Sequence, residues 1–173
     1  MIATTLLIAS TAFAALQQAF DASADWKMDR RLAGSKRIFT TSGTVSCKAG
    51  EGIVWTVLRP FESTIIMGKE EMSFEDEDGK RVKPLSELPH YAALREATDK
   101  FVAGDSHAFD EVFEIEEKSF EDGGWQLKLT PRVRAMKRLI EAVEVGGASL
   151  PTNVVMKAGD GSTSVIRFKE RQR

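Results

Sequence analysis

Residues 43–67 read GTVSCKAGEGIVWTVLRPFESTIIM, and their apolar side chains recur at every second position. Side chains of a β-strand alternate between the two faces of a sheet, so this period predicts strands that bury one face. The two glycines of residues 48–52 permit the positive φ angles of a hairpin loop between two of these strands. The stretch therefore predicts antiparallel strands with one apolar face, which must cover something. The positions on that face are Val45, Cys47, Ile53, Trp55, Val57, Phe61, Ile65 and Met67.

The composition limits the class of protein. A chain of 173 residues with 42% hydrophobic residues is long enough for one domain with a sizeable core. The formal net charge of −2 gives no global positive field that would hold nucleic acid or an anionic membrane. Cys47 is the single cysteine, and His90 and His107 are the only histidines, so we expect no disulfide, no metal site and no cofactor.

The first fourteen residues predict export. MIATTLLIASTAFA is an uncharged apolar run that ends in Ala12-Phe13-Ala14, the pattern of a signal peptide and its cleavage site. The run is too short to cross a bilayer as a helix. No basic residue precedes Lys27, so the alternative is a retained helix that packs on the core. We expect a signal peptide over residues 1–14 and one domain over residues 15–173.

Strand patterns surround one helical segment. Residues 15–25 can form a short helix, and Trp26, Met28 and Arg30 then alternate with charged neighbours as in a strand. Short loops after that strand leave no room for crossover helices, so we expect an antiparallel meander, with a two-residue turn at Asp78-Gly79. The predicted strands lie in residues 26–32, 37–47, 52–60, 63–85, 108–120, 125–131, 142–145, 152–157 and 162–169.

The period changes between residues 86 and 103. Apolar side chains there recur every three or four residues, Ser86 is a candidate N-cap, and Gly104 follows the last turn. A short helical or irregular turn is expected after Pro131. A meander interrupted by an amphipathic helix predicts an α+β fold in which helices pack on one curved antiparallel sheet.

The order of these elements resembles the LolA-like family of periplasmic lipoprotein carriers, from about Trp26 to Phe168. The resemblance rests on weak marks in a consistent order along the chain. They are Gly43 opening a strand, Trp55 followed by Pro60 and Phe61, Trp125 followed by Leu127, Leu129, Thr130 and Pro131, and the turn Gly159-Asp160-Gly161.

The resemblance implies a half-open β-barrel whose concave apolar face holds acyl chains beneath a helical lid. The expected lining is Val45, Cys47, Ile53, Trp55, Val57, Ile65, Met67, Phe113, Trp125, Leu127 and Leu129. The expected lid residues are Leu88, Tyr91 and Leu94 in residues 86–103, with residues 16–22 as a second lid candidate. The residues alone leave another interpretation open, a non-transport protein-docking module with a solid core, because an alternating apolar face more often fills such a core.

One departure from the family concerns the lid. The family pattern places a basic residue, an arginine and a proline where this chain has Lys48, Ala49 and Gly50. The resemblance implies a carrier of a lipoprotein or another acylated envelope lipid. In the family the arginine latches the lid, so its absence favours a relative that carries an envelope amphiphile other than a lipoprotein, such as a glycerolipid, glycolipid or acylated product. The resemblance also implies an inner-membrane exporter and an outer-membrane acceptor as partners, and we expect a monomer.

Three charged groups have simpler alternatives. Arg132, Arg134, Lys137 and Arg138 are a candidate partner-docking cluster, or a solvated surface. The acidic residues 75–78 are interpreted as the solvated end of a β-hairpin, because they lack the ligand spacing of a calcium loop. His107 lies between Asp105 and Asp110, the minimum for general-base chemistry, so a histidine-dependent hydrolase is the rival hypothesis. Without a nucleophile motif nearby, we expect no enzyme.

Overall fold

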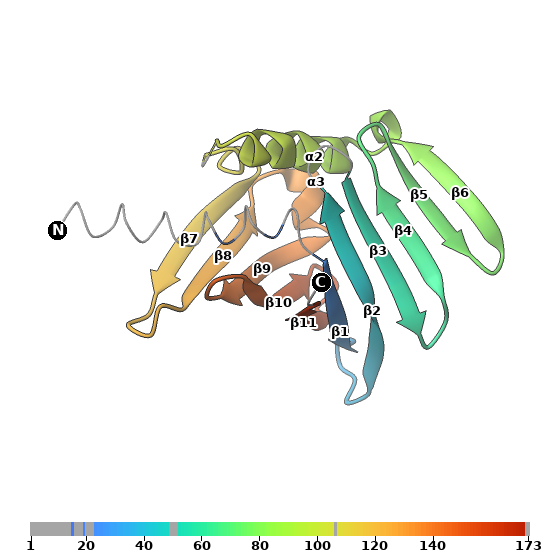
Figure 1. Cartoon of the computed structure of the whole chain (residues 1–173), viewed down its shortest axis with the longest axis horizontal. Coiled ribbons are helices and arrows are strands. Elements are labelled where there is room, and N and C mark those ends of the chain that lie inside the picture. Colours follow the sequence, from blue (N-terminus) through green and yellow to red (C-terminus); the bar gives the residue numbers. More distant parts are fainter. Residues whose placement is uncertain (1–14, 16–18, 20–22, 49–51, 106, 172–173) are drawn as a thin grey trace.

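The computed structural model shows one antiparallel sheet of eleven strands that curves around a helix (Figure 1). It describes residues 15, 19, 23–48, 52–105 and 107–171. The predicted signal peptide, residues 1–14, lies outside these residues, and so does the second lid candidate except for Ala19. No helix in the described part of the chain is long and apolar enough to cross a bilayer.

The first half of the chain forms a meander, as its short turns predict. The strands are β1 (Ser23–Arg31), β2 (Ile38–Lys48), β3 (Gly52–Arg59), β4 (Ser63–Met67), β5 (Glu71–Asp76) and β6 (Gly79–Pro84). Each pairs with the next in antiparallel register. Asp76 pairs with Gly79, so the last turn is centred on Glu77 and Asp78, one residue earlier than predicted.

Two helical segments follow. A 3-10 turn, η1 (Leu85–Glu87), leads into α2 (Pro89–Val102). The predicted N-cap at Ser86 is wrong, because Leu88 occupies that position and Pro89 is the first residue of α2. Proline suits a first turn because its missing N–H would have no partner there. The short α3 (Arg134–Lys137) shows that the turn expected after Pro131 is helical.

The second half returns to the first strand. The strands β7 (Phe113–Ser119), β8 (Trp125–Pro131), β9 (Ile140–Gly147), β10 (Pro151–Ala158) and β11 (Thr163–Glu170) form a second meander. The last strand pairs with β1, which gives the order β6-β5-β4-β3-β2-β1-β11-β10-β9-β8-β7. The sheet is open because β6 and β7 are its two edges. This arrangement confirms the predicted curved antiparallel sheet with a helical lid.

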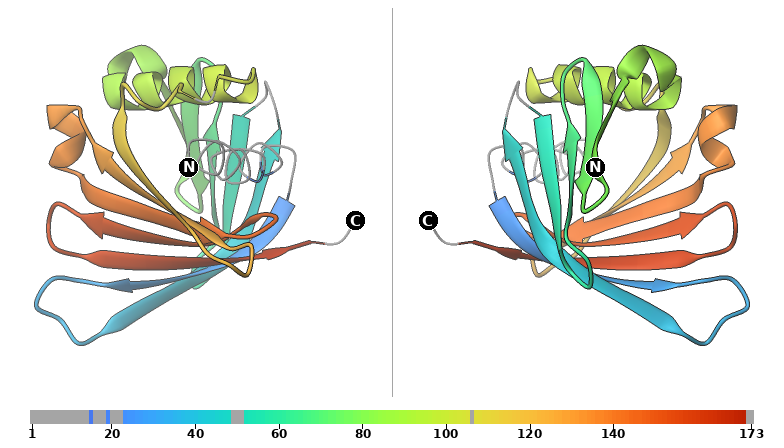
Figure 2. Two further views of the ribbon diagram at one scale, coloured as in Figure 1. Left: turned by 90° about the vertical axis from the view of Figure 1, so that its left-hand side faces the viewer. Right: turned by 90° about the vertical axis from the view of Figure 1, so that its right-hand side faces the viewer.

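The helix α2 lies across the open side of the curved sheet (Figure 2). On one side, Leu94 and Ala97 of α2 pack in a cluster with Phe113, Leu129 and Met136. On the other side, α2 faces strands β3 to β5 across a small apolar pocket. The face of the sheet beneath α2 is therefore the concave face, and α2 bridges its two halves.

Candidate functional site

All eleven predicted lining residues lie on the concave face. Directly paired residues of neighbouring strands share a face. Trp55 pairs with Val45 on β2 and Ile65 on β4. In the same way, Ile53 pairs with Cys47 on β2 and Met67 on β4. The register continues through β1, β11, β10 and β9 to Leu127 and Leu129. One predicted apolar position differs: Phe61 lies in the turn after β3 and is 74% exposed.

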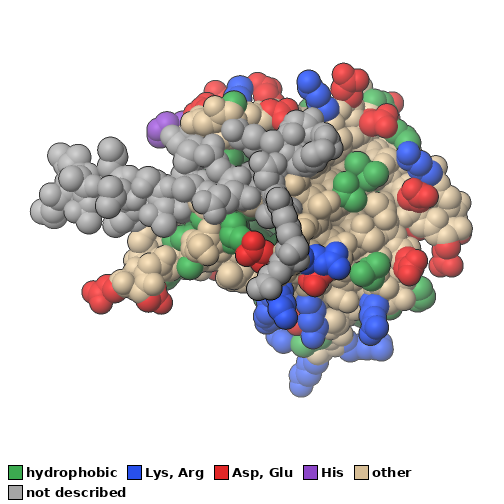
Figure 3. Space-filling view, in the orientation of Figure 1, with side chains coloured by type: hydrophobic (Ala, Val, Ile, Leu, Met, Phe, Trp, Pro, Cys, Tyr) green, Lys and Arg blue, Asp and Glu red, His purple; other side chains and the backbone are tan. Residues whose placement is uncertain are grey.

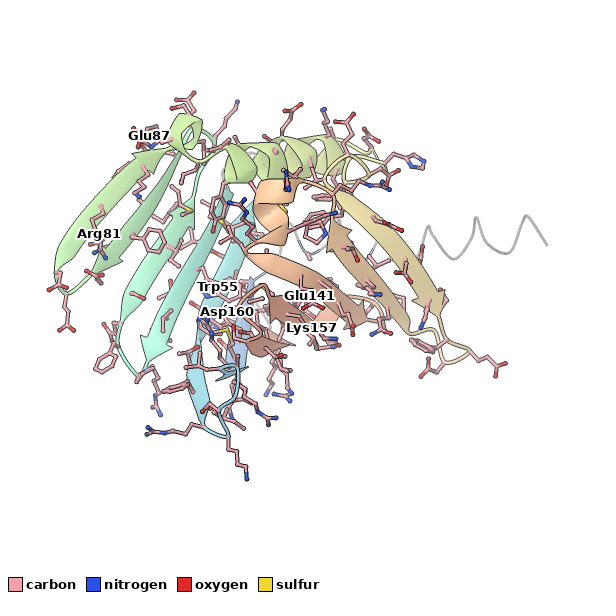
Figure 4. All side chains as sticks on the ribbon, turned by 180° about the vertical axis from the view of Figure 1, so that it is seen from behind. Trp55, Arg81, Glu87, Glu141, Lys157 and Asp160 are labelled. Carbon is pink, nitrogen blue, oxygen red and sulfur yellow. The ribbon has the colours of Figure 1, made fainter. Side chains whose placement is uncertain are left out.

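An aromatic group forms the centre of the concave face, and the sequence prediction missed two of its members. The rings of Trp26 and Trp55 are stacked with centroids 4.8 Å apart, and Phe168 meets Trp55 edge-on at 6.2 Å. Trp55 is labelled in Figure 4. Trp26 lies opposite Gly43, whose missing side chain lets the backbone of β3 at Thr56 and Val57 approach β2 closely. The alternation of Trp26 with charged neighbours was the signal that could have identified it.

The concave face is only partly packed. The seven predicted lining residues on β2 to β4 are half-buried, whereas residues of a dry core would be almost fully buried. Trp125 and Leu127 are buried, and Ala15 packs against them. The face therefore has an occupied end at β8 and a more accessible part near β3.

A cavity of about 450 Å³ lies beneath α2. Its apolar wall includes Tyr91 and Leu94 of α2 with Phe113, Met136 and Met156. The same two α2 residues also line an apolar pocket of about 50 Å³ against Ile53, Met67 and Met72. Of the predicted lid residues, Tyr91 and Leu94 therefore face the cavities, and Leu88 caps the start of α2.

The other end of this cavity is polar. It is formed by Arg30, Arg138, Asp160, Ser162 and Ser164. Arg30 Nη2 lies 3.8 Å from the Asp160 carboxylate and donates a hydrogen bond to Ser162 Oγ at 3.3 Å. Hydrogen bonds from Ser162 hold the pKa of Asp160 below its usual value. Two guanidinium groups and one carboxylate thus share this end.

Two buried polar atoms of the concave face have no hydrogen-bond partner among the described residues. They are Trp26 Nε1 and Thr41 Oγ1. Thr41 pairs with Met28, two residues from Trp26, so the register places both side chains on the same face. Burying such an atom without a partner is costly, and native structures seldom leave one unexplained.

Two titratable side chains also lie on the concave face. Burial raises the pKa of the Cys47 thiol, which keeps it protonated near neutral pH. Burial likewise raises the pKa of Glu117, which lies opposite Leu127. Neither adjoins a group of three or more potential metal ligands, because the described residues form no such group.

The four residues of the predicted docking cluster have different environments. Arg132 donates from Nε to the Phe113 carbonyl oxygen at 3.2 Å and so ties the ends of β7 and β8 together. Arg138 lines the cavity. Arg134 and Lys137 belong to α3 and are exposed.

The predicted histidine pair forms, but on the protein surface. His107 Nδ1 lies 2.8 Å from Asp110 Oδ2, and the histidine side chain is 83% exposed. The Asp105 carboxylate accepts the His107 backbone N–H at 2.9 Å and does not contact the imidazole through that bond. The geometry is that of a surface turn outside the concave face.

Comparison with known proteins agrees with this architecture. Residues 8–152 match the family described as "Outer membrane lipoprotein carrier protein LolA-like". No curated protein sequence matches the chain.

Among solved structures, a LolA superfamily protein from Nitrosomonas europaea has a TM-score of 0.53 at 12% identity, covering 97% of this chain and 93% of that one. A domain described as outer membrane lipoprotein-sorting, from Vibrio parahaemolyticus, has a TM-score of 0.46 at 10% identity, covering 96% and 92% of the two chains. LprF from Mycobacterium bovis has a TM-score of 0.44 at 10% identity, covering 94% and 90%.

Proposed function

Since the chain belongs to the LolA-like family of outer membrane lipoprotein carrier proteins, we propose that it carries an acylated envelope lipid or lipoprotein through the periplasm. The concave face binds the acyl chain, and α2 covers it. The proposal rests chiefly on one observation, the incompletely packed apolar face beside a cavity of about 450 Å³. Each buried methylene contributes about 0.8 kcal/mol, so a chain of ten would contribute roughly 8 kcal/mol before the costs of ordering.

The polar end of the cavity supports an amphiphile as cargo. Arg30 and Arg138 outnumber Asp160 there, which favours an anionic head group at the mouth of the cavity. The unpaired Trp26 Nε1 and Thr41 Oγ1 could bond an ester or amide oxygen of the cargo. Binding of this kind needs no covalent step, and the family is one of non-enzymatic carriers.

Loading and delivery require partners on both sides of the periplasm. We propose an inner-membrane exporter that loads the cavity and an outer-membrane acceptor that empties it. Arg134 and Lys137 are exposed on α3, close to the cavity residue Arg138, and are our candidates for docking such a partner.

Export is the remaining part of the proposal. Residues 1–14 are the candidate signal peptide, which would leave Ala15 as the first residue. Sequencing the N-terminus of protein recovered from a bacterial envelope fraction tests this. We expect Ala15 first, and a chain that still begins at Met1 would argue for a retained helix.

Native mass spectrometry tests the carrier function. We expect the chain purified from an envelope fraction to carry about one lipid, identified after extraction. Trp55→Glu should come out empty, because the carboxylate would lie on the apolar face. Thr56→Glu is the matched control, since Thr56 is half-buried on the opposite face of the same strand. A wild-type chain that stays free of lipid when offered micelles of candidate lipids would favour a solid core and contradict the proposal.

A further inference from the structure

The hairpin between β1 and β2 has a basic and apolar end that lipid binding in the cavity does not explain. We call residues 30–39, RRLAGSKRIF, the hairpin tip; they include four basic residues and no acidic one. Leu32, Ile38 and Phe39 are 41%, 54% and 47% exposed. Large apolar side chains combined with Lys and Arg are typical of segments that lie in a membrane interface.

The register distributes both kinds of side chain around the ribbon. Arg31 pairs with Ile38, and Arg30 pairs with Phe39, so each face has one basic and one apolar residue. The turn is closed by a hydrogen bond of 3.1 Å from the Ser35 N–H to the Leu32 carbonyl oxygen. A defined turn presents these side chains together, which reduces the entropy that binding would cost.

The hairpin tip projects beyond the neighbouring strands. β3 ends at Arg59, which pairs with Ser42, so the first four residues of β2 extend past it by about 13 Å. Figure 1 shows this hairpin as the lowest point of the molecule, and Figure 3 shows Lys and Arg side chains gathered there. A flat surface can therefore meet the tip before it meets the adjacent turns.

Nearby carboxylates leave most of this charge uncompensated. Asp29 accepts a hydrogen bond from Thr40 at 2.7 Å and pairs with Arg167 at 3.1 Å. Asp160 lies near Arg30. Within the described residues, Arg31, Lys36 and Arg37 take part in no ion pair, and Arg37 lies 6.0 Å from the centroid of the Phe39 ring. The acidic turn at residues 75–78 lies at the far edge of the sheet, beyond β3 and β4.

We propose that the hairpin tip docks the protein on a bilayer surface that contains anionic phospholipid. Leu32, Ile38 and Phe39 enter the head-group region, while Arg31, Lys36 and Arg37 contact lipid phosphates. The net charge of −2 does not oppose this, because the attraction is local and decays within a Debye length. Arg30 lies in the tip and also lines the cavity, so docking brings the cavity mouth to the membrane.

Vesicle flotation tests the docking. Wild-type protein should bind vesicles of 3:1 phosphatidylcholine and phosphatidylglycerol at 50 mM salt, and bind pure phosphatidylcholine weakly. Reversing Arg31, Lys36 and Arg37 to Glu should weaken binding by at least 100-fold, since each basic residue contributes about fivefold near an anionic surface. The control reverses Lys69, Lys80 and Lys83, which are exposed in the β4 to β6 part of the sheet, and changes the net charge equally. This control should retain most of the binding.

A second variant isolates the apolar contribution. Ile38→Ser with Phe39→Ser should weaken binding to the anionic vesicles at least tenfold, with thermal melting showing that the protein remains folded. The proposal is overturned if wild type does not bind the anionic vesicles, which would point to an acidic protein as the ligand of the tip, or if the hairpin and control triple variants bind equally. Native mass spectrometry of the hairpin triple variant separates the two proposals. Cargo retained while vesicle binding is lost supports docking, and an empty wild-type chain that still binds vesicles contradicts only the carrier function.

Discussion

Gly43→Ala tests whether the centre of the concave face depends on one missing side chain. Gly43 is in the middle of β2, as the strand predicted over residues 37–47 places it and not at a strand start as the family mark does, and the register between β2 and β3 shifts between Ser42 and Gly43. A methyl group there would lie 1.8 Å from the Thr56 carbonyl oxygen and 3.0 Å from the Val57 Cα. Both atoms belong to the backbone, so no side-chain rotation can relieve the overlap.

The magnitude follows from that geometry. Overpacking a well-filled site usually costs 1–3 kcal/mol, and a backbone clash this close should reach at least about 3 kcal/mol. For a domain of this size each kcal/mol lowers Tm by roughly 2–4 °C, so we expect a decrease of about 6–12 °C. Displacing β3 should also disturb the stack of Trp26 on Trp55 and therefore reduce the near-ultraviolet circular dichroism.

Thermal melting followed by far-ultraviolet circular dichroism measures the decrease in Tm, and the near-ultraviolet spectrum measures the change around the two indoles. Ser46→Ala is the matched control, because Ser46 is an exposed residue of the same strand, and its free energy of unfolding should change by less than about 0.5 kcal/mol. A Gly43→Ala protein with Tm within 2 °C of wild type and an unchanged near-ultraviolet spectrum would refute the close approach of β2 to β3.

Three further predictions concern single side chains. Iodoacetamide should alkylate Cys47 more slowly in the folded protein at pH 8.5 than in urea, because burial raises the thiol pKa; equal rates would contradict this. Hydrogen bonding by Thr40 and pairing with Arg167 lower the pKa of Asp29, so this carboxylate stabilises the fold above pH 4 and less as pH falls through its lowered value. The Tm of Asp29→Asn should therefore decrease less than the Tm of wild type between pH 5 and pH 2.5. Equal decreases in the two proteins would exclude the effect. Trp26→Ala should reduce stability by about 3–5 kcal/mol in urea unfolding, whereas a loss below 1 kcal/mol would mean that this buried indole is not part of the core.

The sequence by itself determined which side chains share a face within each local stretch. Alternation placed Val45, Trp55 and Ile65 together, and the helical period located α2 to within a few residues. Both results follow from backbone geometry, because a strand repeats every two residues and a helix every 3.6, whatever lies opposite. Phe61 departed from the pattern because the strand had already ended at Arg59, where Pro60 begins the turn.

Only the tertiary structure decided which strands meet. The pairing of β1 with β11 joins opposite ends of the chain, and it brings Phe168 to Trp55 and Arg30 to Asp160. The tertiary structure also separated the residues of the predicted docking cluster. Arg138 lines the cavity, whereas Arg132 donates a hydrogen bond to the Phe113 carbonyl oxygen. Local sequence cannot specify such contacts, because each depends on many weak pairings between distant strands that become favourable only when the whole open sheet assembles with α2 across it.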